Sequence, residues 1–321
     1  MSLNKKNAPM IKNVELKLIE IFCNCDDFCQ QYGNEIESKL VPAKLSRERA
    51  LKIPCGLSIS ELMCIEVFYH LQGSKCFKYY YKYFVEAHLK SHFPGLVSYN
   101  RFVQLKPRLF FYLFVFLMAY RLGRQTGTYY IDSGKLVVCH NLRIHSHKVF
   151  DGLAKRGKTS TGWFFGLKLH LVINQFGEVV SFIITPGNVA DNNLKLGLKL
   201  CKDLCGKIFG DKGYISGKLT RELAEQGLHL ITKVKRNMKN KLISLGDNRL
   251  LNKRGVIESV IDILKNICNI EHSRHRSPLN AFVSILAGLA AYSFIEHKPS
   301  IKRKDFNIRE FFADNNLQLG F

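Results

Sequence analysis

Residues 163–185 read WFFGLKLHLVINQFGEVVSFIIT, and this stretch decides the fold. Leucines stand at every second position from Leu167 to Leu171, with Lys168 and His170 between them, and this alternation predicts a β-strand. The letters QFG then predict a tight turn, and VVSFIIT predicts the strand that returns beside the first. A β-hairpin therefore stands near the middle of the chain.

Shorter strands and helices flank this hairpin on both sides. Upstream, TYYI at 128–131 is a β-rich run that ends at Asp132, and downstream KIF at 207–209 is a short buried strand that leads to Asp211. Helices are expected at 191–205, 219–226 and 254–267, and one more strand at 228–233. The predicted order, β-β-β-α-β-α-β-α, indicates an α/β domain over residues 126–300.

Residues 1–125 are predicted to be helical. The expected helices cover 14–29, a stretch from Glu61 with Ser58 or Ser60 as its cap, 77–89 and 98–121. Because these helices are short and rich in Lys, Arg and Tyr, we expect a DNA-binding region that resembles a helix-turn-helix. Residues 301–321 are expected to form a basic C-terminal tail.

The charge balance points to an anionic partner. The chain of 321 residues has 48 Lys and Arg against 26 Asp and Glu, which gives a formal net charge of +22. Solubility needs a net charge no larger than about 8 in a small domain. Because the basic residues are spread along the whole chain, we expect an extended nucleic-acid-binding surface.

Cysteine usage and hydropathy predict a cytoplasmic protein. The ten cysteines have irregular spacings and the N-terminal residues are polar and basic, so we expect reduced thiols and no secretory signal. The apolar run at 109–120 has only 12 residues, and the 17-residue run at 279–295 contains Asn and Ser. We therefore expect buried core helices at both places and no membrane partner.

Asp132 and Asp211 each follow a short apolar strand in the predicted order. Catalytic groups of α/β sheets gather at the carboxyl ends of the strands, so two parallel neighbours would place these carboxylates side by side. Carboxylates that close repel each other unless a cation lies between them. The hard cations Mg²⁺ and Mn²⁺ suit such oxygen ligands.

A third carboxylate is expected from the helix that begins near Arg254. Its apolar stripe leaves Arg254, Glu258 and Lys265 on the other side, although a solvated face with an Arg254–Glu258 ion pair would show the same pattern. Together with the two strand-end aspartates, Glu258 favours a phosphoryl-transfer site with two metal ions.

Asp132 after a strand, the run GDKGY at 210–214, and the pattern R-x3-E-x6-K made by Arg254, Glu258 and Lys265 resemble the DDE transposases of bacterial insertion sequences. The resemblance covers about residues 125–295. It implies a ribonuclease H-like mixed sheet flanked by helices, as in retroviral integrases, and two Mg²⁺ or Mn²⁺ ions held by Asp132, Asp211 and Glu258. The chain departs from several relatives at Leu251, where they carry Tyr.

The resemblance also implies contacts with transposon-end DNA from Arg254 and Lys265. Two basic, His-rich segments are suited to phosphate contacts, and from them we expect Arg143, Lys148, Arg274 and Arg276 to bind DNA. A zinc site is the weaker interpretation of the histidines at 140, 145 and 147, since no cysteines stand at finger spacing. Trp163, the single tryptophan, is expected to be buried in its strand, with stacking on an unpaired DNA base as the alternative.

The leading hypothesis is therefore a transposase that cleaves DNA at insertion-sequence ends and joins the freed 3′-OH to target DNA. Double-stranded DNA with terminal inverted repeats, target DNA and a second copy of the chain are the partners that the family implies, in the bacterial cytoplasm at the nucleoid. Two alternatives remain: a plain nuclease on the same fold, and an inactive protein that still binds DNA ends.

Overall fold

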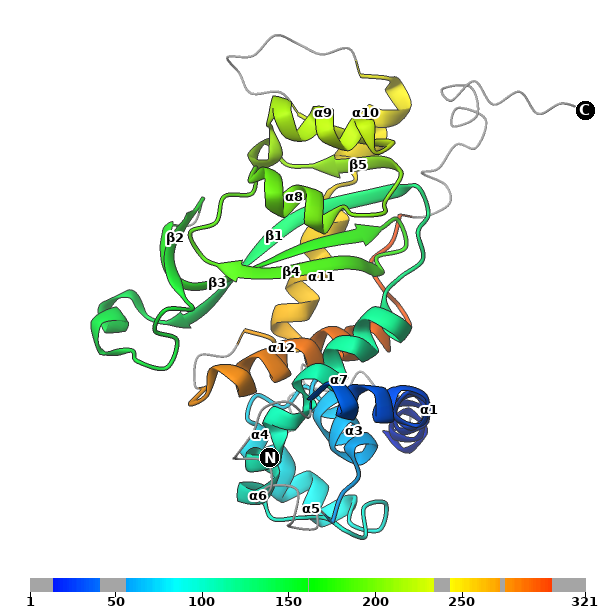
Figure 1. The fold of residues 1–321 in the computed structure, drawn as a ribbon, viewed down its shortest axis with the longest axis vertical. Coiled ribbons are helices and arrows are strands. Elements are labelled where there is room, and N and C mark those ends of the chain that lie inside the picture. The colour runs from blue at the N-terminus through cyan, green and yellow to red at the C-terminus, as the bar shows by residue number, and fades with distance from the viewer. Residues whose placement is uncertain (1–13, 41–55, 161, 234–242, 272–274, 302–321) are drawn as a thin grey trace, which may run out of the picture. The chain divides into compact units, whose positions relative to one another are not determined.

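The computed structural model describes residues 14–40, 56–160, 162–233, 243–271 and 275–301 (Figure 1). The chain divides into two compact units, of which one contains Met1–Arg121 and Ile263–Ile295 and the other contains Leu122–Asp262 and Glu296–Phe321. The sheet unit begins at Leu122. Residues 263–295, however, group with the N-terminal helices rather than with the sheet.

The helix α12 (Pro278–Ser293) explains this grouping. Every residue from Val283 to Tyr292 is buried. A helix that is apolar on all sides needs neighbours all round, and α12 finds them in α3 (Ile59–Tyr69) and α7 (Leu109–Phe116). The last apolar run of the sequence therefore completes the core of the helical unit.

The helical unit begins with α1 (Val14–Leu40), which is longer than the helix expected at 14–29. Ser58 is the N-cap of α3 and forms a capping box with Glu61, which confirms Ser58 among the two predicted caps. The aromatic stretch expected as one helix forms three consecutive helical segments: α4 (Phe77–Tyr80), the π-helix η2 (Tyr81–Val85) and α5 (Glu86–His88).

A fully buried polar cluster lies inside this unit. Glu66 on α3 accepts a hydrogen bond from the ammonium of Lys106 at 2.5 Å and one from Ser284 of α12 at 3.3 Å. The His70 ring lies 3.9 Å from the same carboxylate, and its Nδ1 is 2.5 Å from the backbone oxygen of Cys268. Burial raises the pKa of Glu66, but Lys106 and His70 outweigh it and lower that pKa to about 2.

One continuous helical run, Tyr99–Arg121, is 23 residues long and is apolar enough to cross a membrane by length and composition. It joins α6 (Tyr99–Leu105), η3 (Lys106–Arg108), α7 and the π-helix η4 (Leu117–Arg121), which confirms the helix expected at 98–121; the 12-residue apolar run at 109–120 is its C-terminal half. A core helix of a globular unit meets the same criteria, and the buried side of α7 packs on α12.

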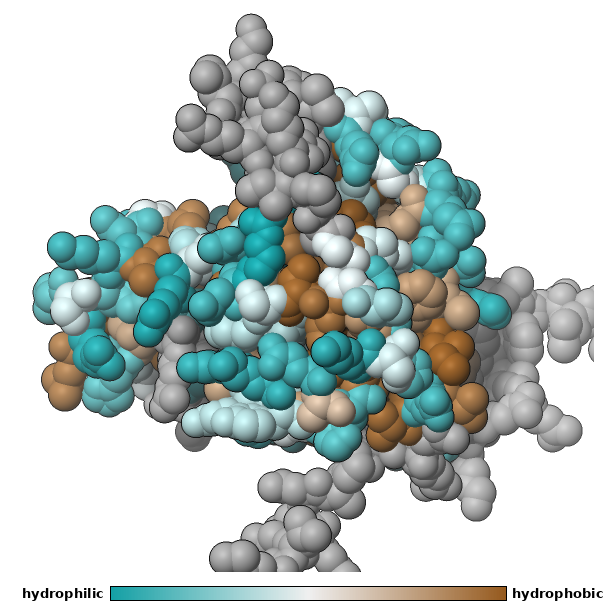
Figure 2. All heavy atoms as spheres, turned by 90° about the horizontal axis from the view of Figure 1, so that it is seen from below, coloured by the Kyte–Doolittle hydropathy of each residue, from teal (hydrophilic) through white to brown (hydrophobic). Residues whose placement is uncertain are grey.

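The face shown in Figure 2 carries hydrophobic patches between hydrophilic side chains.

The second unit is built on a six-stranded mixed sheet. The strands are β1 (Thr128–Cys139), β2 (Lys155–Thr159), β3 (Gly162–Asn174), β4 (Val179–Pro186), β5 (Gly206–Gly210) and β6 (Leu228–Thr232). The strand order is β2-β3-β1-β5-β6, and β4 also pairs with β3. The neighbours β1, β5 and β6 run parallel to one another, whereas β1 and β4 each run antiparallel to β3. The mixed sheet, its flanking helices and the helical N-terminal region confirm the expected fold class.

The first strand runs eight residues further than expected. Asp132 was predicted to follow the strand, but β1 continues to Cys139, and Asp132 pairs with Leu171 of β3. The reason is that the residues after Asp132 keep the antiparallel ladder with β3, whereas parallel pairing with β5 stops at Tyr130. Asp132 therefore lies inside one ladder and just beyond the end of the other.

Helices cover both faces of the sheet. On one face, α8 (Leu194–Leu200) and α9 (Gly217–Glu225) share a core with Tyr129, Ile131 and Ile208. On the other, Tyr130 stacks on Phe209 and donates a hydrogen bond to the backbone oxygen of Leu250 in α10 (Leu245–Asn252). The helix expected at 191–205 is wrong in extent, because Asn193 caps α8 and places its start at Leu194.

Candidate active site at the end of the parallel strands

The register of β1 and β5 brings the two aspartates together. Tyr130 pairs with Phe209, so two further residues along each strand lead to Asp132 and Asp211. Because side chains alternate along a strand, Asp132 lies on the same face as Tyr130, which is the face that α10 covers. Gly210 allows the close approach, since a Cβ there would lie 3.0 Å from Ile131.

The third carboxylate comes from α11 (Gly255–Asn266). Arg254, which stands directly before this helix, donates to Asp132 Oδ2 at 3.1 Å and to Glu258 Oε1 at 2.6 Å. One guanidinium therefore bridges a carboxylate of the sheet and a carboxylate of the helix. The helix pattern allowed either a solvated ion pair or a site contact, and both are partly right. The i, i+4 ion pair of Arg254 with Glu258 exists, and the same guanidinium also contacts Asp132.

Burial and neighbouring charges shift the pKa of Asp132. Burial is the main cause that raises the pKa of Asp132 from 3.8 to about 6, and Asp211 and Glu258 raise it as well. The backbone N–H of Ser133, which donates to Asp132 Oδ1 at 2.8 Å, and Arg254 act in the opposite direction. Asp211 and Glu258 are therefore both close enough to Asp132 to affect its pKa.

The donor set suits a hard divalent cation, because it consists of carboxylate oxygens whose mutual repulsion a cation would relieve. In the described part of the chain, however, no three Asp, Glu, His or Cys side chains are grouped tightly enough to hold a metal ion as they stand. The guanidinium of Arg254 contacts both Asp132 and Glu258. Metal binding would require that these carboxylates exchange the guanidinium for the cation.

A fourth carboxylate, Asp191, was not predicted as a site residue. Its Oδ1 accepts hydrogen bonds from Ser133 at 2.8 Å and from Lys168 at 3.2 Å, and the His170 ring lies 3.7 Å away. Burial, followed by the Lys168 charge, lowers the pKa of His170 to about 4, while Asp191 opposes that shift, so this ring is neutral near pH 7. Ser133 is thus fixed between Asp132 and Asp191.

This second cluster also includes Tyr214, which follows Asp211 by three residues. Burial, then the charges of Asp191 and Asp132, raise the pKa of Tyr214 well above its ordinary range, so the hydroxyl is a neutral group beside the carboxylates. The alternation in β3 gave a signal for this cluster. Lys168 and His170 stand on the polar side of the strand, and both are buried, which demands a partner such as Asp191.

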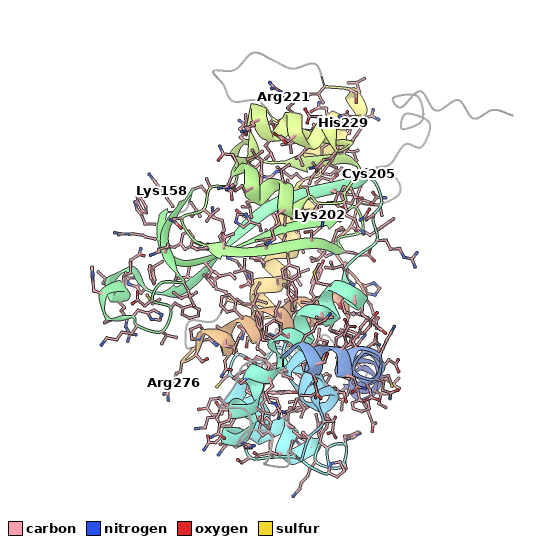
Figure 3. The ribbon with its side chains drawn as sticks, in the orientation of Figure 1. Lys158, Lys202, Cys205, Arg221, His229 and Arg276 are labelled. Atoms are coloured by element: carbon pink, nitrogen blue, oxygen red, sulfur yellow. The ribbon has the colours of Figure 1, made fainter. Side chains whose placement is uncertain are left out.

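The predicted DNA contacts fall in different places. Arg143 and Lys148 are exposed near η5 (Asn141–Ser146), and Arg276 is exposed before α12 (Figure 3). Lys265 forms an ion pair with Glu271 at 3.1 Å, and Arg274 lies outside the described residues.

Trp163 was expected to be buried, and this prediction was wrong, because 55% of its surface is exposed. The outward position follows from the alternation of β3, in which Phe164 takes the buried side. Among the residues that the structure describes, His140, His145 and His147 form no group that would hold zinc.

Part of the chain is similar to a known protein family. Residues 122–278 match the family described as "Transposase DDE domain", and the match begins at the first residue of the sheet unit. Among solved structures, the chain is similar to piggyBac transposase in a synaptic complex with hairpin DNA, with 12% identity and a TM-score of 0.45 over 95% of this chain and 79% of that chain. No curated protein matches the chain. The family match covers residues 122–278, just under half of the chain, and supports a DDE transposase.

Proposed function

We propose that the chain cleaves DNA strands at the ends of its own mobile element and joins the freed 3′-OH to target DNA. The observation that carries this proposal is the strand register, which sets Asp132 beside Asp211 on the face where Arg254 ties Asp132 to Glu258. Strand cleavage and strand transfer both need carboxylates that converge on a phosphodiester, and the effects of Asp211 and Glu258 on the pKa of Asp132 support this role for the three.

Asp132, Asp211 and Glu258 would hold two divalent cations, with Mg²⁺ or Mn²⁺ as the ions that suit their oxygens. Bound ions would lower the pKa of the attacking hydroxyl and stabilise the leaving 3′ oxygen. Arg254 neutralises the carboxylates before binding and then becomes available to a DNA phosphate, which is the role that its predicted DNA contact requires.

The helical unit offers a surface for binding the duplex. Tyr79 and Tyr83 are exposed and stacked with their ring centroids 5.8 Å apart, and Lys78 and Lys82 stand beside them in sequence. Basic and aromatic side chains on one helical stretch suit phosphate and sugar contacts. We propose that this unit recognises terminal inverted repeats and that two copies of the chain act on a pair of ends in the bacterial cytoplasm.

Strand cleavage in vitro tests the proposed function. Purified protein is incubated with a labelled duplex that carries the inverted repeat flanking its own gene, with Mg²⁺ or with EDTA. We expect cutting at the repeat boundary only with Mg²⁺, loss of cutting in Glu258→Gln, and normal cutting in Glu225→Gln, which changes an exposed carboxylate on α9.

The other outcomes distinguish the alternatives. Cutting without preference for the repeat would favour a plain nuclease, and binding without cutting under either metal would favour an inactive end-binding protein. An equal loss of cutting in Glu258→Gln and Glu225→Gln would refute the role assigned to Glu258.

A further inference from the structure

The strands β2 and β3 extend past the end of β1 as a two-stranded ribbon, here called the Trp163 ribbon (residues 155–159 and 162–165) (Figure 1). Lys158 pairs with Trp163 and Arg156 pairs with Phe165. β1 reaches only to the pair Cys139–Phe165, so the residues before Phe165 have β2 as their partner strand.

The two faces of the ribbon differ. On one face Phe164 is buried, and Gly157 is packed so closely that a Cβ there would lie 2.2 Å from the backbone oxygen of Gly187. The pairing places Lys158 and Trp163 on the opposite face, where both are exposed. One side of the ribbon is therefore fixed to the sheet unit, and the other side presents side chains to solvent.

The exposed face carries an aromatic ring between two cations. The guanidinium of Arg156 lies 5.5 Å from the centroid of the Trp163 ring, and the ammonium of Lys158 lies 5.6 Å from it (Figure 3 labels Lys158). Both distances allow cation–π contact, which holds the two charges beside the ring. Asn141 donates a hydrogen bond to the backbone oxygen of Trp163 at 2.9 Å and so anchors the strand at this residue.

The surroundings of the ring are strongly basic. Between residues 140 and 166 the sequence has five Lys and Arg and a single carboxylate, Asp151. Arg143 and Lys148, two of the predicted DNA contacts, belong to this segment. An exposed tryptophan in a basic segment suits a polyanion whose units also carry flat rings, and single-stranded nucleic acid has this chemistry.

We propose that the Trp163 ribbon binds an unpaired stretch of DNA, with one base stacked on Trp163 and the flanking phosphates held by Arg156 and Lys158. The proposal rests on the proposed function for the identity of the nucleic acid as DNA. It adds a binding site outside the carboxylate cluster and assigns the stacking role to a residue that the sequence pattern alone placed in the core.

The fluorescence of Trp163 tests this proposal directly, because the chain has one tryptophan. Full-length protein in EDTA is titrated with an oligothymidine single strand and, separately, with a blunt duplex of the same length. We expect the single strand to quench the fluorescence in a saturable, salt-sensitive way and the duplex to leave it largely unchanged. EDTA excludes metal-dependent cleavage from the readout.

Variants identify the groups involved. With a labelled single strand and anisotropy as the readout, Trp163→Ala is expected to bind about 5- to 150-fold more weakly, and Trp163→Phe to recover most of that loss. Arg156→Ala and Lys158→Ala should shift the quenching midpoint to higher oligonucleotide concentration. The matched control Lys202→Ala, an exposed lysine after α8, should not shift it (Figure 3).

Three outcomes would overturn the proposal: no quenching by the single strand, equal quenching by the duplex, or unchanged single-strand binding by Trp163→Ala. Failure of the proposed function would look different. In that case repeat-specific cleavage is missing while the single strand still quenches the Trp163 fluorescence. The fluorescence of Glu258→Gln should be quenched as in the wild-type protein whether or not the proposed function holds.

Discussion

Replacement of Arg254 by Gln is expected to lower the free energy of unfolding without metal and to increase the stabilisation that a bound cation gives. The side chains of Arg254 and Asp132 are 22% and 21% exposed, so their bond is mostly shielded from water. A hydrogen bond to a charged group of this kind contributes about 1.5–3 kcal/mol. The second bond joins a Glu258 side chain that is 58% exposed and contributes only about 0.3–0.5 kcal/mol.

In EDTA at pH 7.5, Arg254→Gln is therefore expected to lower the free energy of unfolding of the sheet unit by about 2–3 kcal/mol. Because the guanidinium no longer competes for Asp132 and Glu258, excess Mg²⁺ or Mn²⁺ should stabilise the variant more than the wild-type protein. The difference between the two proteins should therefore shrink when metal is added.

Urea denaturation with and without metal measures both effects, and hydrogen exchange of the β1 amides shows that the change lies in the sheet unit. Arg221→Gln is the matched control, because Arg221 is an exposed arginine on α9 (Figure 3). The reasoning is refuted if Arg254→Gln is as stable as the wild-type protein in EDTA, or if metal leaves the difference unchanged.

Three further predictions concern other parts of the chain. Asp191→Asn should lower the free energy of unfolding by about 2 kcal/mol in urea titrations, because it leaves the buried Lys168 without its carboxylate, and adding Lys168→Met should recover part of this loss. Glu66 has a folded pKa of about 2 against an ordinary 4.5, so the unfolded state binds its proton first; the stability that Glu66 contributes is present above pH 4.5 and is lost as the pH falls toward 2. Urea midpoints across this range should fall less steeply in Glu66→Gln than in the wild-type protein. Ser58→Ala removes the capping box of α3 and should cost about 1 kcal/mol by the same titration, whereas Ser58→Asp should cost little.

The sequence predicted the sheet and its carboxylates because both leave local signals. The hairpin at 163–185 has strict alternation and a turn, and the strands before Asp132 and Asp211 are short apolar runs, so each element could be located from its neighbours alone. The six-strand order still required the tertiary structure, because β2, with its basic residues and no apolar face, has no periodicity to find.

The remaining differences come from long-range contacts. Asp191 lies 58 residues from its partner Ser133, and nothing in the segment around Asp191 marks it as the acceptor for a buried lysine. The placement of α12 in the helical unit depends in the same way on packing with distant helices. Trp163 was misplaced because a bulky aromatic in a strand is usually buried, whereas its actual side of the ribbon depends on the pairing with β2.

The continuous strand β1 fixes the distance along the sheet between Asp132 and the Trp163 ribbon. Asp132 and Cys139 stand on one strand, and Cys139 pairs with Phe165 at the root of the Trp163 ribbon. Seven residues of strand span about 23 Å, a length that hydrogen bonds to β3 keep from stretching. In the spacing of a B-form strand this corresponds to about seven nucleotides. Under the two proposals, the cleaved phosphate would lie at a fixed distance from the stacked base, and the cutting position would depend on length along the DNA.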